Sequence, residues 1–108
     1  MKNNLITKFL GILVLSLLWC NISYSDIKSD AKETILKVRA CYFSLPSYAQ
    51  DGAVDSYLDA MTNWNDAVKE ENMGDPRKLA SVFYRNAILY GGVVLQIGNA
   101  YGSQACRP

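Results

Sequence analysis

Cysteine is the residue type of this chain best suited to covalent chemistry, and it occurs at positions 20, 41 and 106. Two cysteines that remain in an oxidising compartment are expected to pair. Free thiols or a metal site would be the alternative. The chain has no histidine, however, so a cysteine pair would need carboxylates to complete the usual zinc ligands. We predict a Cys41–Cys106 disulfide and no metal site.

The absence of histidine also bears on catalysis, because histidine is the commonest general base at neutral pH and the commonest metal ligand. Serine, cysteine and lysine nucleophiles need an activating neighbour. The chain contains no phosphate-binding glycine loop, nucleophile elbow or zinc motif. The sequence therefore predicts no catalytic residues, no cofactor and no enzymatic activity.

Three aspartates could support a different chemistry. Asp55 and Asp59 are one helical turn apart, and Asp66 lies near the same line. They could hold a divalent cation or meet a basic partner, or they could form an ordinary solvated face. Calcium sites usually gather roughly six to eight oxygens from a folded loop, so we favour the solvated face.

The N-terminus has the order of segments found in an export signal. Lys2 and Lys8 are followed by the uncharged apolar run Phe9–Trp19, and Ser23-Tyr24-Ser25 supplies small residues for cleavage after Ser25. The run is shorter than the ~20 apolar residues that span a bilayer. A retained anchor or a buried helix is the alternative to a cleaved signal.

Cys20 stands where a lipoprotein carries its modified cysteine, but it follows Trp19, whereas lipoprotein processing needs Gly, Ala or Ser there. We therefore expect a cleaved signal over residues 1–25 and a single domain over residues 26–108. Removing 25 of 108 residues leaves 83, with 9 basic and 10 acidic side chains. That balance attracts neither nucleic acid nor a charged membrane surface. We expect a periplasmic or secreted protein without stable membrane insertion, from a bacterium with an AT-rich genome.

Helical periodicity predicts a first helix over about Ile27 to Leu45. Pro46 ends it, because the residue before a proline is pushed out of the helical region. A second helix is predicted from about Val54 to Asn72, after a connection over Ser47–Gly52 in which Ser47 or Asp51 is the cap. Its expected solvent side carries Asp55, Asp59, Asp66 and Glu70.

Asp75-Pro76 predicts the start of a third helix, since aspartate caps free amides and proline suits the first helical position. Its apolar stripe is Leu79, Phe83, Ala87, Tyr90, Val94, Ile97 and Tyr101. Gly91-Gly92 could instead be a hairpin turn between strands Ala87–Tyr90 and Val93–Ile97. We favour the helix because the long stripe is the more reliable signal.

These elements predict an all-α fold, a small up-down-up three-helix bundle with one disulfide. The first and third helices then end at the same end of the bundle, which brings Cys41 near Cys106. The closed segment of 65 residues is worth about 4 kcal/mol in the chain-entropy model.

The third helix also carries a row of small residues along one flank, with apolar side chains outside the main stripe. Glycine inside a helix costs roughly 1 kcal/mol relative to alanine, so the row needs an explanation. It could be close packing within the bundle or a surface for a partner. The residues of this tentative partner-binding site are Gly91, Gly98, Gly102, Ile88 and Leu95.

The sequence favours a protein that binds another envelope protein, for example as an inhibitor or accessory subunit, or that self-associates. The alternative is a carrier or sensor for a small apolar ligand in a pocket between the helices, lined by Tyr42, Trp64, Phe83 and Tyr90. Three further aromatic residues are expected to point away from the core and to favour an interface. They are Phe43, Tyr48 and Tyr84.

Overall fold

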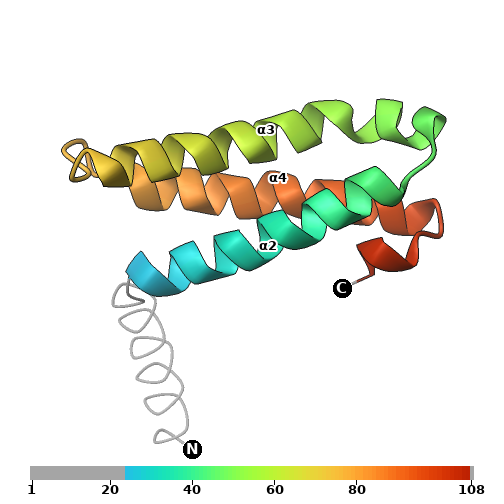
Figure 1. The fold of residues 1–108 in the computed structure, drawn as a ribbon, viewed down its shortest axis with the longest axis horizontal. Helices are drawn as coiled ribbons and strands as arrows, with labels where there is room; N and C mark the ends of the chain where they lie inside the picture. Colours follow the sequence, from blue (N-terminus) through green and yellow to red (C-terminus); the bar gives the residue numbers. More distant parts are fainter. Residues whose placement is uncertain (1–23, 108) are drawn as a thin grey trace, which may run out of the picture.

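A computed structural model describes residues 24–107 and shows three α-helices there, with no strand among the described residues. They are α2 (Tyr24–Ser44), α3 (Ser47–Asn72) and α4 (Ala80–Ala100), followed by the short 3-10 helix η1 (Gln104–Cys106) (Figure 1). The all-helical prediction is confirmed, and the hairpin alternative at Gly91-Gly92 is wrong because both glycines lie inside α4. Most of the predicted signal, residues 1–23, lies outside the described residues.

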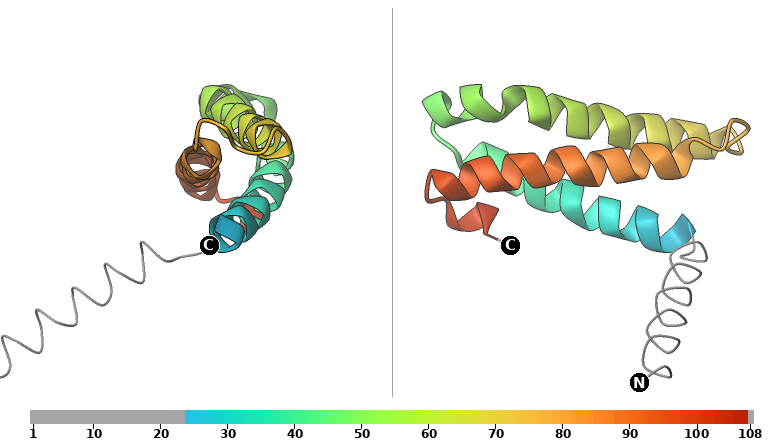
Figure 2. Two further views of the ribbon diagram at one scale, coloured as in Figure 1. Left: turned by 90° about the vertical axis from the view of Figure 1, so that its left-hand side faces the viewer. Right: turned by 180° about the vertical axis from the view of Figure 1, so that it is seen from behind.

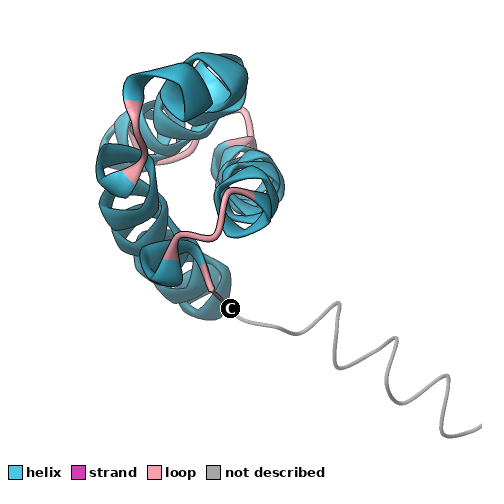
Figure 3. Cartoon of the chain, turned by 90° about the vertical axis from the view of Figure 1, so that its right-hand side faces the viewer, coloured by secondary structure: helices cyan, strands magenta, loops and turns pink. Residues whose placement is uncertain are grey.

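Helix α4 is the element on which the other two converge. It packs extensively against both α2 and α3, whereas α2 and α3 contact each other much less. The end-on views show α2 and α3 covering adjoining sides of α4 (Figures 2 and 3). Consecutive helices run in opposite directions along the molecule (Figure 1). Among residues 24–107, one face of α4 is consequently left without a helix against it.

Helix α2 follows its predicted course. The residues Ala31, Ile35, Val38 and Leu45 are buried, as their spacing of three or four residues indicates. The helix ends at Ser44, and the amide of Leu45 donates to the Tyr42 carbonyl oxygen at 3.1 Å before Pro46 redirects the chain.

Helix α3 begins at Ser47, so the predicted connection over Ser47–Gly52 is wrong. Pro46 is extended (φ −65°, ψ 159°), and its carbonyl oxygen accepts the amides of Ala49 and Gln50 at 2.9 Å each, which starts the helix at once. Gln50 does not form a capping box, because its side chain donates to the Tyr42 carbonyl oxygen at 3.1 Å.

The buried line of α3 consists of alanines rather than of its large apolar residues. Ala53, Ala60 and Ala67 recur every seven residues and are fully buried. The larger apolar residues of α3, whose helical spacing predicted its buried side, lie to one side of this line. Leu58 is exposed, and the others are only partly buried, namely Val54, Tyr57, Met61, Trp64 and Val68. Small side chains on the contact line allow close helix packing, which explains the extensive α3–α4 contact.

Helix α4 begins at Ala80 rather than at the predicted Pro76. Gly74, Asp75 and Lys78 have φ of 85°, 53° and 58°, and this left-handed backbone cannot continue a right-handed helix. The N-cap of α4 is Leu79, which makes no side-chain capping bond, so the predicted cap at Asp75 and the predicted helix start are both wrong. The Asp75 Oδ1 nevertheless accepts the Ala80 amide at 3.0 Å across the loop.

Within residues 24–107, no helix combines the length and the apolar character needed to cross a bilayer.

Candidate interaction surface

The predicted disulfide is present and is built against the backbone of α4. Cys41 in α2 and Cys106 in η1 are bonded, with a Cα–Cα distance of 4.7 Å, and both are fully buried. A Cβ atom on Gly98 would lie 2.6 Å from the Cys41 Sγ and 2.9 Å from the Cys106 Cβ. Gly98 is therefore the position at which the bonded sulfurs can approach α4.

The other glycines of the predicted flank have separate roles within the chain. A Cβ on Gly91 would lie 2.8 Å from the Thr34 Cγ2 and 2.9 Å from the Val38 Cγ2, so this glycine allows α2 to pack closely. Gly102 is exposed at φ 83° in the turn after α4. Packing and turn geometry inside the monomer thus account for these glycines.

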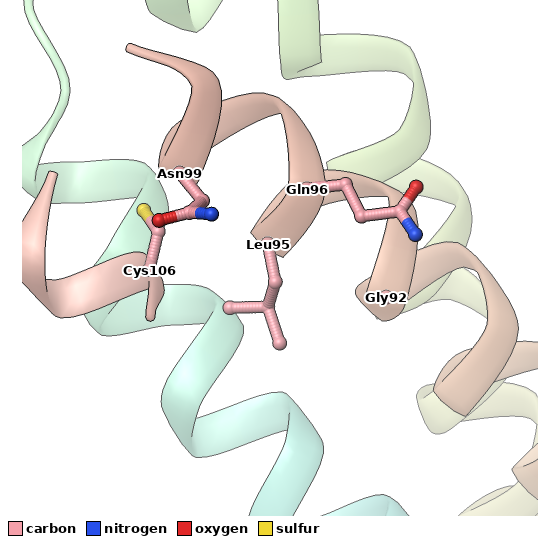
Figure 4. Close-up of a pocket in the computed structure, with 5 residues that line it drawn as sticks. All are labelled: Gly92, Leu95, Gln96, Asn99 and Cys106. Carbon is pink, nitrogen blue, oxygen red and sulfur yellow. The ribbon is translucent and has the colours of Figure 1, made fainter. Parts of the chain in front are cut away.

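The remaining two residues of that prediction, Ile88 and Leu95, lie partly buried. Ile88 packs near the cluster around Tyr84, and Leu95 packs near the disulfide. Leu95 also lines a cavity of about 300 Å³ between α4 and η1, together with Gly92, Gln96, Asn99 and Cys106. Figure 4 shows Leu95 and Gln96 projecting from different sides of α4 in this region.

The face of α4 that no helix of the described residues covers carries three exposed apolar side chains. Val82, Leu89 and Val93, spaced by seven and four residues, share this face and are 46%, 68% and 40% exposed. Tyr90 borders it and is also exposed, and Arg85 is the single charged residue of the whole helix. We call Val82, Leu89, Tyr90 and Val93 the α4 apolar face. Arg85 and Gln96 are exposed on the same side of the helix, so this side carries one charge beside its exposed apolar residues, and such an apolar patch is typical of a contact surface.

The aspartates predicted to share a face lie beside α4. Asp55, Asp59 and Asp66 are exposed, and none forms an ion pair within residues 24–107. In the described part of the chain no group of three or more metal-ligating side chains comes together. The three aspartates therefore form a charged, solvent-facing row.

The four aromatic residues of the predicted ligand pocket are not brought together. Tyr42 stacks on Tyr57 with ring centroids 4.0 Å apart near one end of the molecule. Trp64 and Phe83 belong to the cluster at the other end, and Tyr90 is exposed. Phe83 lines a cavity of about 410 Å³, but its other walls come mainly from charged residues of α3 and the following loop.

Two polar networks join α3 and α4 near the loop between them. Glu70 was predicted on the solvent side but is 1% exposed, because Arg77 folds over it with an Nη2–Oε2 distance of 2.7 Å. Hydrogen bonds from the Arg77 side chain hold the pKa of Glu70 below its ordinary value of 4.5, against the opposing effect of burial. The same pairing raises the pKa of Arg77.

The second network joins all three helices through Glu71. Its Oε2 accepts the Tyr84 hydroxyl at 2.5 Å, and its Oε1 lies 2.9 Å from Lys28 Nζ. Tyr84 is fully buried with its ring 5.3 Å from that of Trp64, so the prediction that it points outward is wrong. A buried tyrosine needs a partner for its hydroxyl, and Glu71 supplies it. Phe43 and Tyr48 are exposed as predicted.

The α4 apolar face is the surface that sequence reasoning missed. Its signal was the seven-residue spacing of Val82 and Leu89 opposite the main stripe, in a helix with one charge. The chain matches no protein-family model, no curated protein and no solved structure.

Proposed function

We propose that this is a small exported, disulfide-stabilised helical protein that acts by binding another protein through the α4 apolar face. The observation that carries the proposal is the exposure of Val82, Leu89 and Val93 on one line of a helix whose only charge is Arg85. Exposed apolar patches on small proteins commonly mark interaction sites. Inhibition of an envelope enzyme, or service as its accessory subunit, is the role we favour.

Export rests on the N-terminal sequence and on the disulfide. Disulfides persist in oxidising compartments and are rare in the cytosol. The Cys41–Cys106 bond therefore supports a periplasmic or secreted location after removal of residues 1–25. Cleavage after Ser25 would fall within the first turn of α2 and would leave the described packing of that helix in place.

A non-catalytic role agrees with the polar groups that the structure describes. The buried carboxylate, Glu70, is engaged by Arg77, and the buried tyrosine, Tyr84, is engaged by Glu71. Both groups stabilise the junction of α3 and α4 through these contacts. Binding, which needs only a surface, is the function that these residues support best.

Site-specific photocrosslinking in the producing cells tests the proposal. A crosslinking residue at Leu89 is expected to give a discrete adduct, whose second component is identified by mass spectrometry. Leu36 is the matched control, because it is an exposed leucine of similar accessibility on α2. A crosslink to a second copy would identify self-association.

The proposal fails if positions 82, 89 and 93 give no adduct while Leu36 does. Replacement of Leu89 by Gln should abolish the adduct formed through Val93 without changing the unfolding midpoint, since Leu89 is largely exposed. Loss of the adduct through global unfolding would be visible as a lost helical circular dichroism signal, so the two effects are separable.

A further inference from the structure

The acidic row of α3, defined as Asp55, Asp59 and Asp66, lies on the side of α3 that borders α4. Tyr48, Asp55, Asp59 and Asp66 are spaced by seven, four and seven residues, so they share one face of α3. Beyond Asp55 on this line, the Tyr48 ring lies 5.7 Å from the ring of Tyr101, the residue that caps the C-terminal end of α4. At the other end Asp66 and Phe83 of α4 line the same cavity. The row thus meets α4 at Asp66, and the line that it follows reaches the C-terminal end of α4 through Tyr48.

The row and the α4 apolar face therefore lie on two helices that are packed against each other. Helices α3 and α4 run side by side in opposite directions over their length (Figures 1 and 2). The side of α4 nearest α3 carries Phe83 and Tyr90, and the exposed line of Val82, Leu89 and Val93 follows around the helix. A partner lying along α4 would touch apolar side chains and have carboxylates along one edge.

We infer that the partner contributes a basic amphipathic helix, which lays apolar residues on Leu89 and Val93 and directs lysine or arginine side chains to Asp55 and Asp59. This rests on the proposed function, and it adds the class of partner. Helix-in-surface binding of this kind uses apolar anchors at helical spacing, and opposite charges at its edge set orientation and specificity.

Charge complementarity separates this occupant from a second copy of the chain. Asp55 and Asp59 have no cationic partner within residues 24–107, so their charge is available to a ligand. A second copy docking through α4 would offer Arg85 as the one cation of that helix. A basic helix would offer several cations to the acidic row, whereas α4 of a second copy would offer one. The 21 residues of α4 extend about 30 Å, which a partner helix of similar length would cover.

Two fluorescent peptides of about 20 residues provide the probe. Both place leucine on one helical face, and one carries lysine on the other face while the second carries glutamate. Binding to the purified exported protein is measured by fluorescence anisotropy at two salt concentrations. We expect the lysine peptide to bind at least ~10-fold more tightly, with an advantage that shrinks at high salt.

The double variant Asp55→Lys/Asp59→Lys should weaken binding of the lysine peptide by about 10-fold or more. Its control is Asp30→Lys/Glu33→Lys, which makes the same change in charge on exposed residues of α2. Asp66 is left unchanged because its charge also acts on Arg77, near the α3–α4 loop. Retained helicity and an intact disulfide show that each variant is folded.

Equal loss of binding in the two double variants, or equal binding of the two peptides, would overturn the inference. So would the absence of binding by either peptide. If crosslinking at Leu89 still yields an adduct in those cases, the proposed function stands and only the class of partner is wrong. If Leu89→Gln changes neither the adduct nor peptide binding, the surface itself is wrong and both proposals fall.

Discussion

Gly98 lies directly against the sulfur of Cys41, so closely that a methyl group at this position would come within 2.6 Å of it. The same methyl group would lie 2.9 Å from the Cys106 Cβ. Real carbon–sulfur contacts are considerably longer, and the two cysteines are fixed to each other and to separate elements. Glycine therefore occupies this helical position because the disulfide fills the space that a side chain would need. The conformational freedom of its backbone is not the reason.

Replacing Gly98 with alanine should consequently destabilise the protein, although alanine is the better helix former. Overpacking a tight core costs roughly 1–3 kcal/mol, which exceeds the ~1 kcal/mol gained in helix propensity. Urea unfolding followed by circular dichroism measures the difference. The thiols should also become easier to reduce if α2 is pushed away from α4.

Gly92 supplies the matched control in the same helix. No heavy atom lies within 4 Å of the Cβ that alanine would add there. Gly92→Ala should therefore stabilise the protein by roughly 0.5–1 kcal/mol. We expect the change in unfolding free energy to have opposite signs for Gly98→Ala and Gly92→Ala. Destabilisation by both substitutions would show that packing around the disulfide does not cause the effect at Gly98.

Tyr84→Phe tests the network centred on Glu71. The substitution keeps the ring against Trp64 but removes the hydroxyl that donates to Glu71 Oε2. A hydrogen bond to a charged group contributes about 1.5–3 kcal/mol, so we expect a loss at the lower end of that range. Tyr90→Phe, at an exposed ring, should leave the unfolding free energy nearly unchanged. Equal effects would contradict a stabilising role for the Glu71 contact.

Local sequence signals were sufficient for the existence of the helices and for the disulfide. Apolar spacing located α2 through Ala31, Ile35 and Val38, and the parity of the cysteines paired Cys41 with Cys106. The helix signal works because it depends on residues that are close in sequence. The disulfide signal works because it depends only on the number of cysteines left after the signal is removed. The start of α3 was misplaced because Ser47–Gly52 combines turn-forming residues with a proline before it, and such residues also begin helices.

Burial was harder to predict because it depends on partners distant in sequence. Glu70 is buried because Arg77 covers it, and Tyr84 is buried because Glu71 meets its hydroxyl. Alanine has a weak apolar signal, so the row formed by Ala53, Ala60 and Ala67 was overlooked. The spacing of Val82 and Leu89 indicates a second apolar line on α4, but whether that line is exposed depends on which sides of α4 are covered by α2 and α3.

Removal of the disulfide should cost much of the stability of so small a domain. The bond joins residues 65 apart, and the chain-entropy model assigns such a closure about 4 kcal/mol. Cys41→Ala/Cys106→Ala should lower the unfolding free energy by about this amount, and reductant should then have no further effect. Alkylation of the unreduced natural protein should label neither cysteine. Labelling of both would show that the thiols are free.

The pairing of Glu70 with Arg77 should make stability depend on acidity. The pKa of Glu70 in the folded protein lies below 4.5, its ordinary value, chiefly because Arg77 donates hydrogen bonds to the ionised carboxylate. A depressed carboxyl pKa contributes stability above the unfolded value, and that contribution is lost as the pH falls through the folded value. The pair should therefore stabilise the protein at neutral pH and progressively less below about pH 4.5.

Arg77→Met isolates this contribution, because it removes the charge and keeps much of the side-chain volume. The variant should be less stable than the natural protein at pH 7, and the difference in urea midpoint should shrink as the pH is lowered towards about 3. Arg39→Met, at an exposed residue of α2, is the control and should lower the midpoint little at any pH. A difference that stays constant from pH 7 to the acid limit would mean that Arg77 acts by packing over Glu70 rather than by stabilising its charge.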